Sequence, residues 1–85
     1  MKISFAIPSY GHFELVNQLL VDLHKHCMPA EIVVVEDKSG DQAALVGLQW
    51  WAENYGVKVF TPAENLGFLK ASNYAMRECT GDIIC

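Results

Sequence analysis

A run of four β-branched residues at 32–35, followed directly by Glu36 and Asp37, constrains this sequence more than any other feature. A continuous apolar run is typical of a parallel strand buried on both faces, and the two acids would then lie at its carboxyl end. That edge of an open α/β sheet is where ligands bind. Carboxylates accept hydrogen bonds from base N–H and ribose hydroxyl groups, so the pattern indicates a nucleoside site. Alternatively, the acids are only solvated, and Asp41 caps a helix.

The remaining sequence alternates strands and helices. Helical spacing of apolar residues predicts helices over 12–27, from Asp41 to just before Gly56, and from 68 to about 79. The expected strands are 3–8, 32–36, 57–61 and 82–85. Pro8 should end the first strand because it has no N–H to donate. Right-handed crossovers stack such units into a three-layer α/β/α sandwich with a parallel sheet, here one domain over 1–85.

Composition excludes several classes of function. The chain has 85 residues and a formal net charge of -4, without the basic stripe that nucleic-acid binding requires. No apolar run approaches the ~20 residues of a membrane span. Pro8 and the polar residues after it interrupt the first apolar stretch too early for a signal peptide, which predicts a cytoplasmic protein. The three cysteines and three histidines lack the spacing of metal ligands, so they predict no metal site.

Three segments carry a family resemblance: 7–10 (Ile-Pro-Ser-Tyr), 34–41 (Val-Val-Glu-Asp-Lys-Ser-Gly-Asp) and 65–73 (Asn-Leu-Gly-Phe-Leu-Lys-Ala-Ser-Asn), the last continuing to 80–84. Together they resemble the nucleotide-sugar-binding half of the family 2 glycosyltransferases, which are inverting enzymes of the GT-A fold. The likeness covers essentially the whole chain. It implies a truncated GT-A fold with a Rossmann-like parallel sheet of about four strands in the order 3-2-1-4.

The resemblance also implies roles for four residues at the ends of the first two strands. Tyr10 would contact the nucleobase, and Pro8 would shape the floor beneath it. Asp37 would hydrogen-bond the base, with Glu36 supporting it from the adjacent position. Only one of the two acids should lie in the pocket, because successive strand side chains face opposite ways. The alternative for Tyr10 is a loop aromatic at a helix entrance.

The turn at 65–68 would bring backbone close to the nucleotide, and Gly67 suits that approach because it has no side chain. Lys70 would reach the base or the phosphates. In the alternative interpretation, Asn65 caps a helix, Phe68 lies in the core and Lys70 is solvated. The resemblance favours a UDP-sugar donor over guanosine-type or thymidine-type donors.

Members of the family follow the strand at 82–85 with an acidic motif that holds a divalent metal, Mg or Mn, and with a downstream general base. Neither is present before Cys85, so the sequence predicts a donor-binding half without catalytic residues, inactive alone. The complete enzyme would transfer a sugar to an acceptor hydroxyl in polysaccharide biosynthesis. We expect association through the unfinished sheet edge, as a homodimer or with the missing C-terminal half. The alternative is a non-catalytic nucleotide-binding or structural α/β interaction module.

Overall fold

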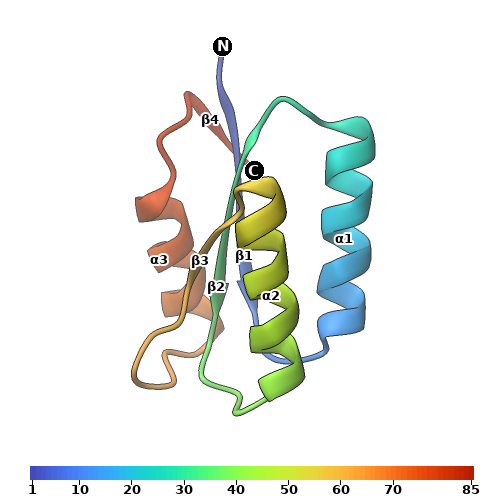
Figure 1. Ribbon diagram of the computed structural model, residues 1–85. Coiled ribbons are helices and arrows are strands. Elements are labelled where there is room, and N and C mark those ends of the chain that lie inside the picture. Colours follow the sequence, from blue (N-terminus) through green and yellow to red (C-terminus); the bar gives the residue numbers. More distant parts are fainter.

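The computed structural model describes residues 1–85 and shows a four-stranded parallel sheet with three helices (Figure 1). The elements are, in chain order, β1 (Ile3–Ser9), α1 (Phe13–His26), β2 (Glu31–Glu36), α2 (Gln42–Tyr55), β3 (Lys58–Phe60), α3 (Phe68–Glu78) and β4 (Ile83–Ile84). The strand order is β3-β2-β1-β4, and all three pairings are parallel. The predicted fold class and strand order are confirmed.

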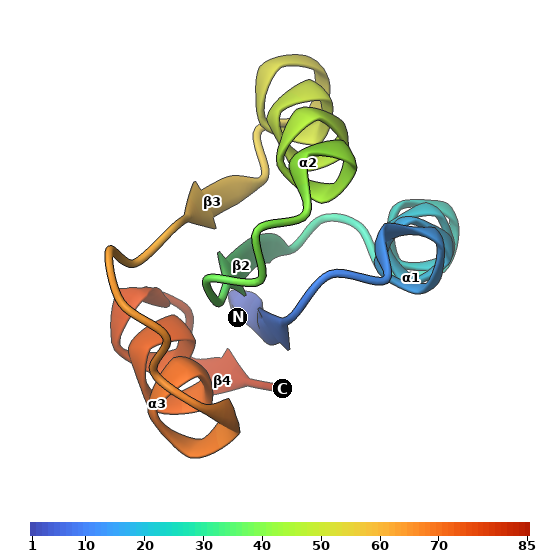
Figure 2. The same cartoon turned by 90° about the horizontal axis from the view of Figure 1, so that it is seen from below.

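The sheet lies between two helical layers. Viewed along the strands, α1 and α2 cover one face and α3 covers the other (Figure 2). Leu20 and Leu48 of the paired helices pack with Val34 of β2 in the larger core. Ala71 and Ala75 of α3 pack against Val33 and Val35 in the smaller one. Every residue of β2 is buried, as its unbroken apolar sequence predicts for a central parallel strand.

The first strand passes through Pro8 and ends at Ser9, so the prediction that Pro8 terminates it is wrong. Ala6 N donates to Cys85 O on the β4 side of β1, and Pro8 N faces the same side because backbone N–H groups alternate along a strand. The pairing of Pro8 with Val35 of β2 therefore loses no donor. A proline tolerates such a position because no neighbouring strand requires its missing N–H.

Local signals at the ends of α2 agree with the sequence. The Asp41 side chain accepts a hydrogen bond from Ala44 N at 3.2 Å, and Gly56 adopts the left-handed conformation with φ 72°. Within the helix, Trp51 is 5% exposed and Trp50 is 51% exposed. Gly47 faces the ring of Phe13, which leaves no room for a Cβ atom at that position. None of the helices is long and apolar enough to cross a membrane.

At the amino-terminal edge of the sheet, Glu31 is a buried carboxylate that connects four segments. It accepts hydrogen bonds from Lys58 Nζ, from Ser4 Oγ at 2.6 Å and from Thr80 N at 2.7 Å. The Lys58 bond, followed by those from Ser4 and Thr80, holds the pKa of Glu31 well below its usual range, although burial opposes this. Glu31 thereby ties β1, β2, β3 and the end of α3 together.

Candidate functional site

A cavity of about 350 Å³ opens at the carboxyl edge of the sheet, between the end of β1 and the start of α3. Parallel strands bring their carboxyl ends together here, which is where open α/β sheets bind ligands. The lining residues are Pro8, Ser9, Tyr10, Asp37, Asn65, Gly67, Phe68 and Ala71. Four of the six predicted site residues, Pro8, Tyr10, Asp37 and Gly67, thus lie around one cavity.

Asp37 lies just after β2 and is almost completely buried, at 4% exposure. Its Oδ1 accepts hydrogen bonds from Leu66 N at 2.7 Å and from Lys38 N at 3.0 Å, and its Oδ2 accepts one from Gly67 N at 2.8 Å. Burial raises the pKa of this carboxyl, but the three backbone N–H groups outweigh it and hold the pKa below its ordinary value. Asp37 is therefore a charged group that fixes the turn at 65–67.

The Glu36 side chain supports a different loop. Its Oε1 accepts from Ser9 Oγ at 2.6 Å, and its Oε2 accepts from Gly11 N at 2.9 Å and from Ser39 Oγ at 2.8 Å. Glu36 does not line the cavity, in keeping with the opposite directions of successive side chains at a strand end. Glu36 holds the connection between β1 and α1 in place. Its carboxylate is bonded to Ser9, Gly11 and Ser39 and not to Asp37.

Two aromatic rings lie at the rim of the cavity. Tyr10 is 56% exposed, and Phe68 is 79% exposed. The alternative that placed Phe68 in the core is therefore wrong, because Ala71 and Ala75 form the buried face of α3 instead. Four further residues line the cavity and are not among the predicted site residues, although all of them belong to the segments that carry the resemblance: Ser9, Asn65, Phe68 and Ala71.

The glycine in the turn is required by its backbone conformation. Gly67 has φ 81° and ψ 163°, a region that is essentially restricted to glycine. Asn65 stabilises the same turn, because its Oδ1 accepts a hydrogen bond from Gly67 N at 3.1 Å. The structure therefore places Gly67, not Asn65, at the N-cap of α3.

Lys70, the remaining predicted site residue, is exposed on the first turn of α3 and does not line the cavity. Its side chain has no hydrogen-bond or ion-pair partner in the chain. A contact between Lys70 and a nucleotide thus stays a prediction.

We next asked whether side chains of this chain could hold a metal ion. Nowhere do three His, Cys, Asp or Glu side chains come together in a way that could hold an ion. The carboxyl groups of Asp37 and Glu36 are occupied by N–H and O–H donors, which would have to be displaced by a cation. These residues therefore do not fit a divalent metal.

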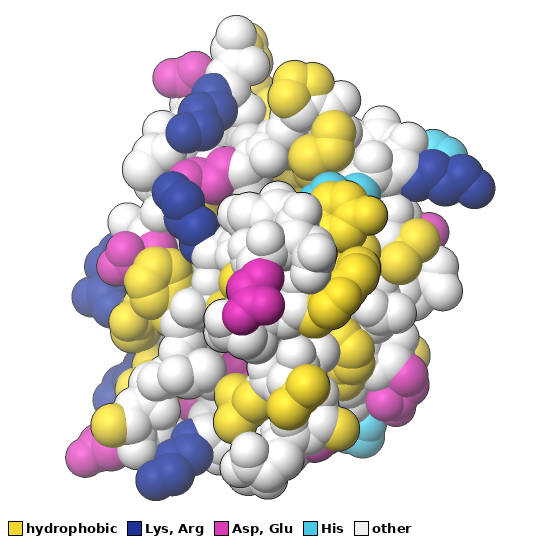
Figure 3. All heavy atoms as spheres, viewed as in Figure 1, with side chains coloured by type: hydrophobic (Ala, Val, Ile, Leu, Met, Phe, Trp, Pro, Cys, Tyr) yellow, Lys and Arg dark blue, Asp and Glu magenta, His cyan; other side chains and the backbone are white.

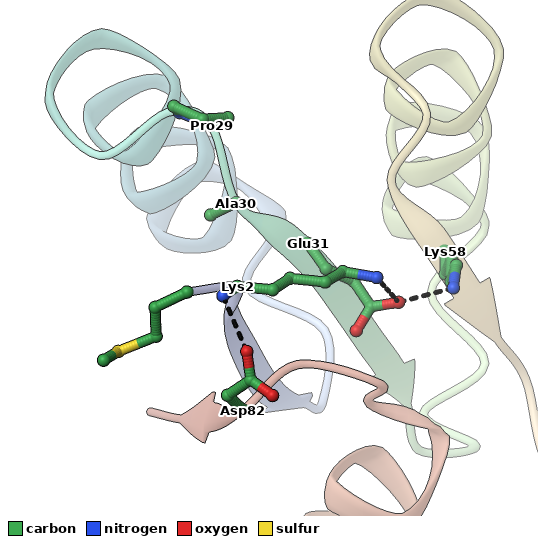
Figure 4. A pocket seen from close by; sticks show the side chains of 7 residues that line it. Lys2, Pro29, Ala30, Glu31, Lys58 and Asp82 are labelled. Carbon is green, nitrogen blue, oxygen red and sulfur yellow. Dashed lines mark hydrogen bonds and ion pairs between the residues drawn. The ribbon is translucent and has the colours of Figure 1, made fainter.

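A larger, open cavity of about 760 Å³ lies at the opposite edge of the sheet (Figure 4). Lys2 and Lys58 both point toward Glu31 there, and the carboxylate of Asp82 accepts a hydrogen bond from Lys2 N at 3.0 Å. Glu31 is thus paired with two lysines, and Asp82 is bonded to a backbone N–H group. Because the carboxyl ends of the strands lie at the other edge, we assign the functional site to the smaller cavity.

Comparisons with known proteins identify the family and the fold. The sequence profile of Glycosyl transferase family 2 matches residues 4–85. A search of curated proteins found no match. TarS 1-349 from S. aureus superimposes with a TM-score of 0.85 at 31% identity, covering 99% of this chain and 26% of that one. The same protein in complex with UDP-GlcNAc gives a TM-score of 0.84 at 31% identity, covering 99% and 25%.

The mannosyltransferase PcManGT from Pyrobaculum calidifontis, in complex with GDP-Man and Mn²⁺, gives a TM-score of 0.84 at 25% identity, with coverage of 98% and 26%. The chain thus spans about a quarter of the length of these structures. The profile match extends over nearly all of the chain, and the fold and strand order agree with it. The chain belongs to glycosyl transferase family 2.

Proposed function

We propose that the cavity between β1 and α3 binds the nucleotide of a nucleotide-sugar donor, for transfer of the sugar to an acceptor hydroxyl in a complete enzyme. The observation that carries the proposal is the convergence of Pro8, Tyr10, Asp37 and Gly67 on one cavity at the carboxyl edge of the sheet. Its volume of about 350 Å³ falls in the usual range for small-molecule sites, about 300–1,000 Å³. In this proposal, residues 1–85 are the donor-binding part.

The cavity offers both surfaces that a nucleobase requires. The exposed rings of Tyr10 and Phe68 provide planar apolar faces, on which a base can stack. Pro8 forms an apolar wall without an N–H group that would need a partner. Asp37 provides a negatively charged acceptor for a base N–H group.

The hydrogen bonds of Asp37 favour uracil over guanine. A carboxylate has about four lone-pair sites, and three are already used by backbone N–H groups. The remaining site, on Oδ2, matches the single N–H of the uracil ring. Guanine presents a ring N–H and an amino group side by side, so one of its donors would lack an acceptor and pay a desolvation penalty. The TarS complexes with UDP and UDP-GlcNAc agree with this preference, whereas PcManGT was crystallised with GDP-Man.

Affinity for the phosphates should be low in this chain alone. Lys70 is the cation on α3 closest in sequence to the cavity, and the residues of the chain do not fit a metal. We propose that Lys70 provides a point charge for the pyrophosphate and that the catalytic half of the enzyme joins at the β4 edge. The cytoplasmic location and the role in polysaccharide biosynthesis stay predictions from the sequence.

The proposal is tested by titrating the ¹⁵N-labelled chain with UDP, GDP and dTDP. We expect saturable shifts of the amides around Tyr10 and Gly67, with UDP binding most tightly. Tyr10→Ala should weaken UDP binding about tenfold, the equivalent of one lost stacking contact of 1–3 kcal/mol. Tyr55→Ala is a matched control, because both tyrosines are 56% exposed and Tyr55 lies on α2, away from the cavity.

Two results would contradict the assignment. One is the absence of saturable shifts with any of the three nucleotides, which would favour a structural or interaction module instead. The other is an equal loss of UDP binding in Tyr10→Ala and Tyr55→Ala, which would indicate that the shifts do not come from this cavity.

A further inference from the structure

The two ends of β2 carry the same arrangement of side chains. Its first residue, Glu31, is the register partner of Ser4 on β1, and its last residue, Glu36, is the partner of Ser9. In both pairs the serine Oγ donates to the glutamate Oε1 at 2.6 Å. Figure 3 shows acidic side chains scattered over the surface of one face, whereas Glu31 and Glu36 are buried, at 9% and 3% exposure. Because a buried carboxylate is retained only with hydrogen-bond partners, the groups that each one holds indicate its role.

At the carboxyl edge of the sheet, Glu36 holds both neighbours of Tyr10. Ser9 is bound through its Oγ to Glu36, and its backbone oxygen accepts from Asp37 N at 2.7 Å. On the other side of Tyr10, Gly11 N donates to Glu36 Oε2 at 2.9 Å. The backbone of Tyr10 is thus tied to the end of β2 from both sides by one side chain.

The Tyr10 ring depends on this backbone for its position. It is 56% exposed, and no hydrogen bond or aromatic pair within the chain holds it. The loop beside it has a conformation that requires support, because His12 lies in the left-handed region with φ 47° and ψ 50°. That region is uncommon for a residue with a side chain. Loosening of the loop would therefore move the ring.

From these contacts, and resting on the proposed function, we propose that Glu36 is a positioning residue for nucleotide binding. It acts by holding the Tyr10 ring where a base stacks, and it does not itself touch the nucleotide, since it does not line the cavity. Its length matters more than its charge, because one oxygen must reach Gly11 N while the other meets Ser9. Glu31 lies at the opposite end of the strand and has no part in this.

Two substitutions separate the length of Glu36 from its charge. Glu36→Asp keeps the carboxyl group but withdraws its oxygens by about 1.5 Å, one C–C bond, so they no longer reach both Ser9 and Gly11. Glu36→Gln keeps the length. Its amide oxygen can replace Oε2, and its amide nitrogen can replace Oε1, whose only partner is a serine hydroxyl that can rotate to accept. Glu31→Asp is the matched control.

The ¹⁵N-labelled variants are titrated with UDP. Glu36→Asp should bind about fivefold more weakly than the original chain, and its loss should not exceed the ~tenfold expected of Tyr10→Ala, through which it acts. Glu36→Gln and Glu31→Asp should each bind within about twofold of the original chain. In the Tyr10→Ala background, Glu36→Asp should cause no further loss, because the ring that Glu36 positions is already absent.

The heteronuclear ¹H–¹⁵N NOE, measured without nucleotide, tests the same inference independently of UDP. In Glu36→Asp, the NOE at Tyr10 and Gly11 should fall, which reports faster backbone motion. It should stay unchanged at Gly67, because Asp37 holds that residue. In Glu31→Asp, it should stay unchanged at all three positions. Circular dichroism checks that each variant folds.

Three titration results would overturn the proposal. An equal loss in Glu36→Asp and Glu36→Gln would assign the effect to the charge, and an equal loss in Glu36→Asp and Glu31→Asp would assign it to general destabilisation. A further loss on adding Glu36→Asp to Tyr10→Ala would show a route that does not involve the ring.

Failure of the proposed function is a separate result. If the original chain binds no nucleotide, the proposed function fails, and the NOE decides whether Glu36 holds Tyr10. An NOE at Tyr10 and Gly11 that is the same in Glu36→Asp as in the original chain would overturn the proposal whether or not UDP binds.

Discussion

Glu31 and Asp37 are charged residues inside the fold, and both are stabilised by donors that fix their ionised forms. Each has a pKa below its ordinary value in the folded chain. Such a carboxyl binds protons more weakly when folded than when unfolded. Its contribution to stability is therefore fully present above the unfolded pKa and is lost as the pH falls through the folded value.

We expect Glu31→Gln to be about 1–3 kcal/mol less stable than the original chain at pH 7, because a charged acceptor of several hydrogen bonds is lost. The difference should shrink as the pH falls below 4.5, the ordinary pKa of this group. Urea unfolding followed by Trp51 fluorescence at pH 7, 5 and 3 measures it. Glu64→Gln, at an exposed loop position, is the control and should change little at any pH. A difference that is independent of pH would contradict a role for the Glu31 charge.

At the scale of elements, the contact between α1 and α2 depends on a glycine. Replacing a helical glycine by alanine usually stabilises a protein by about 1 kcal/mol. At Gly47, the new Cβ atom would collide with the ring of Phe13, so we expect Gly47→Ala to be destabilising instead. Phe13→Leu should lose less stability in the Gly47→Ala background than in the original chain. Thermal unfolding of the two single variants and the double variant measures this coupling, and simple additivity would show that the ring moves aside freely.

Elements with strong local signals were predictable from the sequence. The Asp41 cap and Gly56 act through nearby backbone, so they do not depend on distant parts of the fold. The apolar run before Glu36 indicates a strand buried on both faces by its composition alone. The prediction for Pro8 is wrong because its tolerance depends on which side of β1 its N atom faces, and that side is set by the pairing with β2 and β4. Phe68 was misjudged because small alanines, rather than its ring, fit between α3 and the sheet.

Some residues of the candidate site were likewise predictable from the sequence, and others were not. Asp37 and Gly67 could be located from the sequence because the motif and the end of β2 both point to them. Their mutual hydrogen bond could not, since it joins positions thirty residues apart through a backbone N–H group that any residue type except proline would carry. Ser9 and Ser39 were missed for a related reason, because serines that bind a buried carboxylate have no pattern of their own.

At the scale of the whole molecule, the sequence predicts a donor-binding part without the residues of the transfer step, and the cavity has a volume of about 350 Å³. We expect the purified chain to release no nucleotide from UDP-GlcNAc or GDP-Man in the presence of Mn²⁺ or Mg²⁺. A coupled assay for released UDP or GDP measures this, with the mannosyltransferase PcManGT and GDP-Man as the positive control. Metal-dependent release that is abolished by Asp37→Asn would show that the chain is catalytically complete.

The opposite directions of Glu36 and Asp37 have a consequence for how the cavity moves. One side chain anchors the loop that begins at Tyr10 and the other anchors the turn at Gly67, and both are attached to the end of the most buried strand. The two walls therefore cannot open locally without breaking bonds to β2. Amide hydrogen exchange at Gly11 and Gly67 should thus approach the rate set by global unfolding, unlike exchange at an ordinary surface loop. A nucleotide entering this cavity would find walls that are already ordered.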